Sequence, residues 1–265
     1  MPQSVSPSID NLEHTWRSLI DLCASLSEEE WRRPTGCPGW SVQDNVSHLI
    51  DYEERALGWP APAIGSVKRP HTKNALGQSN EVGVESRRRR SPTEVLEELR
   101  TVTAARAAQL RALTAEDLLK DAVTPAGPGT VADMLTLRVM DTWSHEQDIR
   151  RAIAQPGHGS GPAAAEAIGH FARFLPIIVA KRAAAPDGTV VVFDIGEVHR
   201  CAIEVVAGRA HTLDTDAASW TVRLTMASTT FAALVGGRSD APDDVTIDGD
   251  AELGRKIVGA LGFMP

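Results

Sequence analysis

Residues 130–154 read TVADMLTLRVMDTWSHEQDIRRAIA, and the apolar spacing of this stretch predicts one long helix. Thr130 and Asp133 have the spacing of a capping box, which marks the first turn. The face predicted to pack in the core consists of Val131, Met134, Leu135, Thr142, Ile149, Ala152 and Ile153. Arg138, Asp141 and His145 fall on that same face. Charged groups within an apolar stripe are unfavourable unless they are paired or bind a metal, so this helix predicts a buried polar site.

A second capped helix is predicted over residues 41–57, with Ser41 as its N-cap and Asp44 in the capping-box position. Its apolar stripe consists of Val42, Val46, Leu49, Ile50 and Leu57. His48 lies on the flank of that stripe rather than at its centre. This position predicts a histidine that faces a cavity at the edge of the core.

His48, Asp141 and His145 are the candidate metal ligands. Asp141 and His145 are four residues apart, so both side chains point the same way from one helix. A histidine from a neighbouring helix would complete a three-ligand site with open positions, which is how proteins hold catalytic rather than structural zinc. Arg138, one turn earlier, is placed to hold the aspartate. The alternatives are a histidine hydrogen-bonded at a loop edge and a plain salt bridge between Arg138 and Asp141.

Four further residues are predicted near this site, each with a simpler alternative. Cys37 would be a fourth ligand that closes the site, or would pack in its Gly-Cys-Pro-Gly turn. Asp148 is a competing carboxylate, ranked below Asp141 because of its spacing from His145. Trp40 would form a pocket wall or part of the core. Tyr52 would line the site as a proton donor or pack in the core.

The stretch QPGHGSGP at 155–162 is the predicted linker between two domains, residues 1–157 and 158–265. The first domain is predicted to be a four-helix bundle, a fold whose interior often holds metal sites. Its helical segments are 7–26, 41–57, 81–117 and 130–154, with a loop at 124–130. The second is predicted to be a smaller α+β domain. Its helices are expected at 163–184, 228–235 and 250–261, and its strands at 189–195, 201–208, 220–226 and 245–249.

The composition favours a soluble cytoplasmic protein. The 265 residues carry a formal net charge of −8, which argues against nucleic acid as a partner. No apolar run approaches the roughly 20 residues that span a bilayer, so no membrane partner is expected. The N-terminus lacks the pattern of a secretory signal, and three widely spaced cysteines fit a reducing compartment. A monomer or weak homodimer is expected. The run of four arginines at 87–90 is interpreted as a solvated helix surface.

Two motifs resemble the mycothiol-dependent maleylpyruvate isomerase family, a branch of the DinB-like metal-binding four-helix bundles. They are TGCPGWSVQDNVSHL at 35–49 and RVMDTWSHEQDIRRAI at 138–153. The resemblance extends to FAALVGGR at 231–238 and VTIDGDAELGRKI at 245–257, which are similar to a sterol-carrier-like appended domain. It implies metal ligands at His48, Asp141 and His145, with aspartate where the family usually has glutamate. It also implies an arginine from the C-terminal domain near the active site, for which Arg238 is the candidate.

The same resemblance implies a small-thiol-dependent enzyme with mycothiol as the thiol and Zn²⁺ or another divalent metal as the cofactor. A thiolate could add to an electrophilic double bond, allow rotation and leave, which is isomerisation; if it stays attached, the reaction is S-transfer. Trp40 and Tyr52 are the candidates to line the cofactor site, and Arg138 or Arg238 to bind a substrate carboxylate. For each arginine, a salt bridge is the simpler alternative. The alternative functions are a non-catalytic protein that binds a metal and a small ligand between its domains, and a metal-dependent hydrolase.

Overall fold

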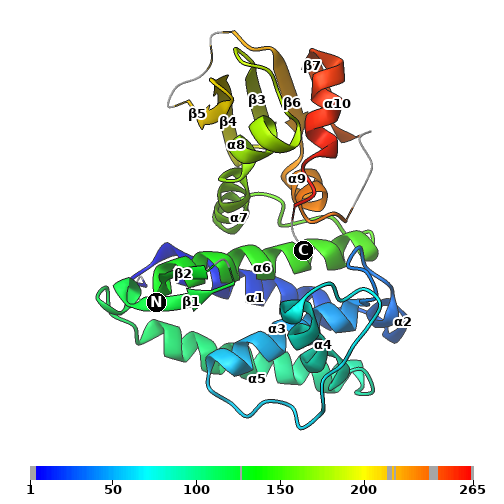
Figure 1. The fold of residues 1–265 in the computed structure, drawn as a ribbon. Helices are drawn as coiled ribbons and strands as arrows, with labels where there is room; N and C mark the ends of the chain where they lie inside the picture. Colours follow the sequence, from blue (N-terminus) through cyan, green and yellow to red (C-terminus); the bar gives the residue numbers. More distant parts are fainter. Residues whose placement is uncertain (1–3, 126, 214–216, 218, 239–243, 264–265) are drawn as a thin grey trace. The chain divides into compact units, whose positions relative to one another are not determined.

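The computed structural model describes residues 4–125, 127–213, 217, 219–238 and 244–263. The chain divides into two compact units, Met1–Gly157 and His158–Pro265. The first unit is helical and the second contains a five-stranded sheet, so the predicted α+β class is confirmed (Figure 1). Each unit is described by itself below.

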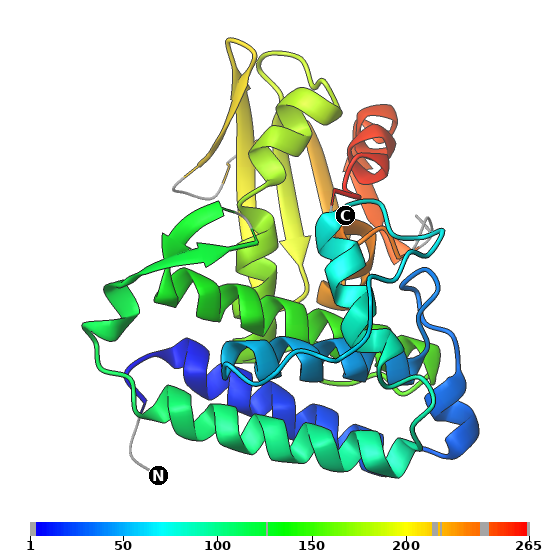
Figure 2. The same cartoon turned by 60° about the horizontal axis from the view of Figure 1, so that its bottom comes forward.

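Four long helices form the bundle of the first unit. They are α1 (Pro7–Ala24), α3 (Val42–Ala56), α5 (Pro92–Arg111) and α6 (Val131–Ala152). Helix α1 packs against α5 and α6, and α3 packs against the same two helices, which closes the bundle (Figure 2). Part of the shared core is a cluster of Leu19, Leu22, Cys23, Trp31, Val42, Val46, Leu49, Ile50, Val95, Leu99, Val102, Ile149 and Ile153.

The two predicted capping boxes fix where the site-bearing helices begin. Ser41 accepts a hydrogen bond from the backbone N–H of Asp44, whose side chain accepts one from the backbone of Ser41. Thr130 and Asp133 make the same reciprocal pair at the start of α6. Because these bonds satisfy N–H groups that have no partner within the helix, each start is locally determined. The pattern therefore fixes the residues at which α3 and α6 begin.

The structure differs from the sequence prediction in the connections of the bundle. A short helix α2 (Glu28–Arg32) lies between the predicted helices 7–26 and 41–57. The segment 81–117 is divided into α4 (Ala75–Glu85) and α5, because Ser91 caps a new helix that has Pro92 in its first turn. A 3₁₀ turn at Asp117–Leu119 then leads into a hairpin of β1 (Asp121–Thr124) and β2 (Gly127–Thr130). The loop predicted at 124–130 is therefore largely strand, with Ala126 outside the described residues.

The second unit is built on a sheet with the strand order β5-β4-β3-β6-β7. Strands β3 and β6 are parallel, and the other neighbours are antiparallel. The strands are β3 (Val190–Ile195), β4 (His199–Val206), β5 (Arg209–Thr212), β6 (Val222–Met226) and β7 (Thr246–Gly249). The helices are α7 (Pro162–Ala172), α8 (Leu175–Ile177), α9 (Ser228–Val235) and α10 (Ala251–Gly259), with a π-helical turn at Ile178–Arg182. Among the described residues of this unit, β5 is the one strand that was not predicted, and its burial does not alternate clearly.

One segment of the second unit corrects an expectation about membranes. Residues Pro162–Arg182 are long and apolar enough to cross a membrane by length and composition alone, with a mean hydropathy of 1.4. The statement that no apolar run approaches spanning length is therefore wrong for this segment. Half of its most apolar window is buried within the protein, and a buried core helix meets the same criteria.

Candidate metal centre

His48 of α3 and the pair Asp141 and His145 of α6 come together inside the bundle. Nε2 of His48 lies 3.3 Å from Oδ2 of Asp141. Nε2 of His145 lies 3.5 Å from Oδ1 of the same carboxylate. One ligand atom from each residue can be chosen so that all lie within 4.8 Å of one another. The structure thus brings together the three residues that the sequence predicted as ligands.

The spacing of these atoms fits a tetrahedral metal ion. Bonds of about 2.1 Å at tetrahedral angles place neighbouring ligand atoms about 3.4 Å apart. The two histidine-to-carboxylate distances in the cluster are 3.3 and 3.5 Å. Two imidazoles and one carboxylate are also a donor set that proteins use for catalytic zinc. The donor set and these two distances, each to a different oxygen of Asp141, are compatible with a small divalent cation.

His48 is more deeply buried than its place on the flank of the apolar stripe suggested. Its ring packs 5.2 Å from the Trp40 ring and 5.0 Å from the His145 ring, measured between centroids. Burial lowers the pKa of His48, and the charge of nearby Arg138 lowers it further, against the effect of Asp141. A neutral imidazole at pH 7 keeps a lone pair for a metal. Asp141, with a side chain 28% exposed, is the least buried of the three.

Arg138 fixes Asp141 from one turn earlier on α6. Its Nη1 donates to Oδ2 of Asp141 at 2.6 Å, and its Nε donates to Oε1 of Glu53 at 2.9 Å. Burial alone would raise the pKa of Asp141, but Arg138 and the two histidines hold it well below its usual range. Glu53 in turn accepts from Nε of Arg106 at 3.2 Å. The Arg138 guanidinium is therefore held between two carboxylates. This arrangement supports a role in orienting Asp141 and leaves few N–H groups to bind a substrate.

Tyr52 contacts Arg138 rather than the three ligands. The guanidinium carbon of Arg138 lies 3.5 Å from the centre of the Tyr52 ring, a cation–π contact. The hydroxyl donates to the sulfur of Met134 at 2.9 Å. Burial raises the pKa of Tyr52, so its proton is firmly held. These contacts favour a packing role, and its predicted place in the cofactor site stays a prediction.

Cys37 and Asp148 lie at the other nitrogen of the His145 ring. Sγ of Cys37 is 3.8 Å from Nδ1 of His145 and donates to Oδ2 of Asp148 at 3.1 Å. The same oxygen of Asp148 is 3.3 Å from Nδ1. The lone pairs of the two imidazole nitrogens diverge, so a cation bound at Nε2 would be directed away from Cys37. The alternative in which Cys37 closes the site is therefore disfavoured by the geometry.

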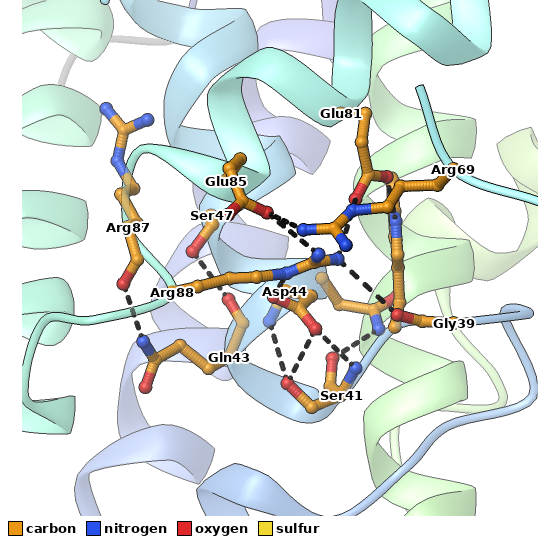
Figure 3. A network of polar contacts seen from close by, with 12 residues as sticks. Gly39, Ser41, Gln43, Asp44, Ser47, Arg69, Glu81, Glu85, Arg87 and Arg88 are labelled. Atoms are coloured by element: carbon orange, nitrogen blue, oxygen red, sulfur yellow. Dashed lines mark hydrogen bonds and ion pairs between the residues drawn. The ribbon is translucent and has the colours of Figure 1, made fainter. Parts of the chain in front are cut away.

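Trp40 forms one wall of the cluster and is held by a carboxylate that the sequence did not single out. The rings of Trp40 and His145 have centroids 5.8 Å apart. The indole N–H donates to Oε2 of Glu81 at 3.0 Å, and Glu81 is fully buried. His71 and Arg88 also contact the Glu81 carboxylate, at 3.0 and 2.7 Å. Figure 3 shows Arg88 extended between Glu81 and Asp44. Glu81 thus links the long connection before α4 to the wall of the site.

The arginine run at 87–90 is not the solvated helix surface that was predicted. Helix α4 ends at Glu85, and the run lies in the turn that follows it. Arg87 is buried and contacts Glu54 at 2.6 Å and Glu98 at 3.0 Å. Arg88 is partly buried among acidic side chains, while 89 and 90 are exposed. The interpretation failed for the first two arginines because carboxylates from distant segments, including Glu54 and Asp44 of α3, pair with them.

Arg238 lies just after α9, in the second unit. Its guanidinium donates to the backbone carbonyl of Gly236, two residues earlier. Gly237 between them has a φ of 62°, a left-handed conformation that glycine adopts without strain. The predicted role of Arg238 beside the metal cluster remains a prediction.

The chain is similar to two uncharacterized proteins from strains of Mycobacterium tuberculosis, at 29% identity over 157 residues. The matched region is 56% of this chain and 56% of each relative, so it spans only about half the length of those proteins.

Two solved structures share the fold. One is the mycothiol-dependent maleylpyruvate isomerase, with a TM-score of 0.55 at 15% identity. The other is a histidine-to-alanine mutant of the mycothiol-dependent maleylpyruvate isomerase, with a TM-score of 0.58 at 14% identity. Each comparison covers 93% of both chains.

The family that matches the sequence confirms the resemblance seen in its motifs. The model of the mycothiol maleylpyruvate isomerase N-terminal domain matches residues 12–150. That region runs from within α1 to within α6 and includes His48, Asp141 and His145. With more than half of its length matched, the chain belongs to the mycothiol maleylpyruvate isomerase N-terminal domain family.

Proposed function

We propose that this protein is a metal-dependent enzyme that uses a small thiol, mycothiol, to isomerise a small electrophilic substrate. Family membership supports the thiol and the reaction class. The observation that carries the proposal is the cluster of His48, Asp141 and His145, whose ligand atoms can be chosen to lie within 4.8 Å of one another. The metal would be Zn²⁺ or another divalent ion.

The three ligands leave room for a further ligand. His48, Asp141 and His145 would fill three positions of a tetrahedral site, and Cys37 lies at the far nitrogen of the His145 ring. When bound, the ion would lower the pKa of a thiol or water in the open position and so supply a nucleophile at neutral pH. A site of this kind favours catalysis over a purely structural or storage role.

The chain's own residues would orient the ligands and restrict the access of water. Arg138 holds the carboxylate of Asp141 through a bond of 2.6 Å. Trp40 covers both histidine rings on one side. A thiolate would add to a carbon of a cis double bond that is conjugated to a carbonyl, and the carbonyl would take up the electron pair as an enolate. The new carbon–carbon single bond would rotate, and return of the electron pair would expel the thiolate and leave the double bond trans. The thiol is regenerated, and no oxidant or reductant is needed.

A substrate carboxylate would be bound by Arg238 rather than by Arg138. The Arg138 guanidinium already bonds Asp141 and Glu53, so Arg238, the arginine that the family resemblance implies, is the better candidate. Replacing Arg238 with Met should raise KM for a carboxylate substrate at least about tenfold, since a charged hydrogen-bond pair is worth about 1.5–3 kcal/mol. The metal content should not change. Equal kinetics in the variant would remove Arg238 from the substrate site.

The function is tested with zinc-loaded protein, mycothiol and maleylpyruvate, alongside other cis-alkene carboxylates. We expect isomerisation that requires the thiol without consuming it, and no activity for His48→Ala. Millimolar mycothiol should also raise the melting temperature of the metal-loaded protein only. Consumption of one thiol per product would instead establish S-transfer. Metal-dependent turnover without thiol would establish a hydrolase, and metal binding with no reaction would favour a sequestering protein.

A further inference from the structure

The buried side chain of Asn45 points its carbonyl oxygen at the ring of His145. Asn45 lies on α3, is completely buried, and places Oδ1 2.8 Å from Nδ1 of His145. This nitrogen is on the side of the ring away from Asp141, which faces Nε2. Asn45 therefore contacts a candidate metal ligand without belonging to the ligand cluster.

The orientation of the Asn45 amide is fixed by its other bonds. Its Nδ2 donates to the backbone carbonyl of Ser41 at 2.8 Å and to Oγ1 of Thr35 at 2.9 Å. A backbone carbonyl only accepts hydrogen bonds, and the Thr35 hydroxyl donates its own proton to the carbonyl of Trp40. A flipped amide would therefore place two acceptors against each other at Ser41. Only Oδ1 can face the imidazole, and an amide oxygen only accepts.

We propose that Asn45 is a positioning residue that keeps the proton of His145 on Nδ1 and so reserves Nε2 for the metal. The inference rests on the proposed metal-dependent function. Nδ1 of His145 faces two acceptors, Oδ1 of Asn45 at 2.8 Å and Oδ2 of Asp148 at 3.3 Å, whereas Cys37 is a weaker and longer donor to Oδ1 at 3.5 Å. Nδ1 therefore carries the proton, and the lone pair of a neutral ring is then on Nε2, beside Asp141. The negative charge of Asp148 makes the His145 ring a more basic metal ligand.

The turn TGCPGWS at 35–41 thereby acquires a role in the site. Thr35 and Ser41 hold the Asn45 amide, and Cys37 donates to Asp148 on the same side of the ring. His48 has no matching support, since its Nδ1 has no hydrogen-bond partner among the residues that the structure describes. His145 is accordingly the ligand whose orientation is set by hydrogen bonds, and His48 the one set mainly by packing.

Two substitutions at Asn45 separate positioning of the ligand from support of the fold. Asn45→Asp loses the donors to Thr35 and Ser41 but keeps an acceptor for Nδ1–H. Asn45→Leu loses both. Loss of such a partner typically weakens metal binding by about 10- to 100-fold. We therefore expect Asn45→Leu to bind Zn²⁺ that much more weakly than the wild type, and Asn45→Asp to bind it about as tightly as the wild type.

Gln43→Leu is the matched control. Gln43 is another buried amide of α3, and its Nε2 donates to the backbone carbonyls of Arg87 and Arg90, away from the cluster. This variant should lose stability but retain the wild-type affinity for Zn²⁺. The proposal that Asn45 positions His145 is wrong if Asn45→Asp and Asn45→Leu weaken Zn²⁺ binding equally. It is also wrong if Asn45→Leu binds Zn²⁺ as tightly as the control.

A measurement on the unmodified chain covers the case in which Asn45→Leu does not fold. Long-range ¹⁵N–¹H correlation spectra of the zinc-loaded wild type distinguish a protonated Nδ1 from a protonated Nε2. We expect Nδ1 of His145 to carry the proton. A proton on Nε2 with the metal on Nδ1 would overturn the inference while leaving the metal-dependent function intact. A wild-type protein that binds no metal would refute the proposed function itself.

Discussion

Nη1 of Arg138 lies 2.6 Å from Oδ2 of Asp141, and this contact holds the carboxylate between the rings of His48 and His145. Both residues were expected to share one face of their helix, three positions apart. We propose that this contact helps the shorter aspartate to act as a ligand at the position where the family usually has glutamate. The backbone of α6 and the guanidinium together restrict where the carboxylate oxygens lie.

Replacing Arg138 with Met should weaken the metal site rather than substrate binding alone. The change leaves buried Glu53 with one fewer partner and frees the Asp141 carboxylate to rotate. Removing one member of a buried ion pair destabilises a protein by about 3–5 kcal/mol, and loss of a ligand-orienting partner weakens metal binding by about 10- to 100-fold. Denaturant unfolding and Zn²⁺ titration measure the two effects.

Arg138→Lys tests the same prediction with a smaller change. Lysine keeps the charge but cannot bond Asp141 and Glu53 with a planar fork or stack on Tyr52 in the same way. Its affinity for Zn²⁺ should fall between those of the wild type and Arg138→Met. If both variants bind Zn²⁺ normally and show only a higher KM, Arg138 is a substrate-binding residue and its orienting role is refuted.

Cys37→Ser should retain metal in the same stoichiometry as the wild type. Serine preserves a hydrogen-bond donor for Asp148, and the sulfur lies on the Nδ1 side of His145. Cobalt-substituted wild-type protein, without added thiol, should accordingly lack thiolate-to-metal charge-transfer absorption in the near ultraviolet. Such absorption in the wild type, abolished in Cys37→Ser, would show that Cys37 is a ligand and that the site is closed.

Metal binding should release a proton from His145. Burial alone would lower the pKa of His145, but Asp141, Asp148 and Cys37 raise it well above its usual value of 6.5 in the metal-free fold. The metal-free imidazole is therefore protonated at neutral pH, and a cation must displace that proton. Calorimetric Zn²⁺ titrations at pH 7 in two buffers of different ionisation heat should reveal about one proton released per ion.

The raised pKa of His145 also determines how the stability of the metal-free protein varies with pH. A histidine whose pKa is higher in the folded state stabilises the fold fully below its unfolded pKa, and this contribution is lost as the pH rises through the folded pKa. The stability difference between the wild type and His145→Gln should therefore shrink as the pH rises above about 6.5. A difference that grows over this range would mean that the pKa of His145 is lowered in the fold.

Local sequence signals were enough to predict the framework of the site. Capping boxes and apolar periodicity located α3 and α6, and the four-residue spacing put Asp141 and His145 on one face. These features depend on neighbours within a few positions along the chain, so they can be recognised in a single sequence. The hairpin before α6 was missed because its second strand reads Gly-Pro-Gly-Thr, which has little strand character of its own.

The support around the ligands depends on contacts between distant segments and could not be predicted in that way. Asn45, Glu53 and Glu81 are ordinary polar residues in the sequence, yet each is almost completely buried. Their partners lie 100, 85 and 41 positions away, respectively, at His145, Arg138 and Trp40. A polar residue on the buried side of a predicted helix is the only signal that would have marked Asn45.

Metal analysis of the purified protein tests the central claim most directly. Prepared without chelators, the wild type should contain close to one divalent ion per chain, whereas His48→Ala and His145→Ala should contain none. His14→Ala, which alters an exposed histidine on α1, is the matched control and should keep the ion. A folded wild-type protein without metal, which also fails to bind added Zn²⁺, would contradict the account.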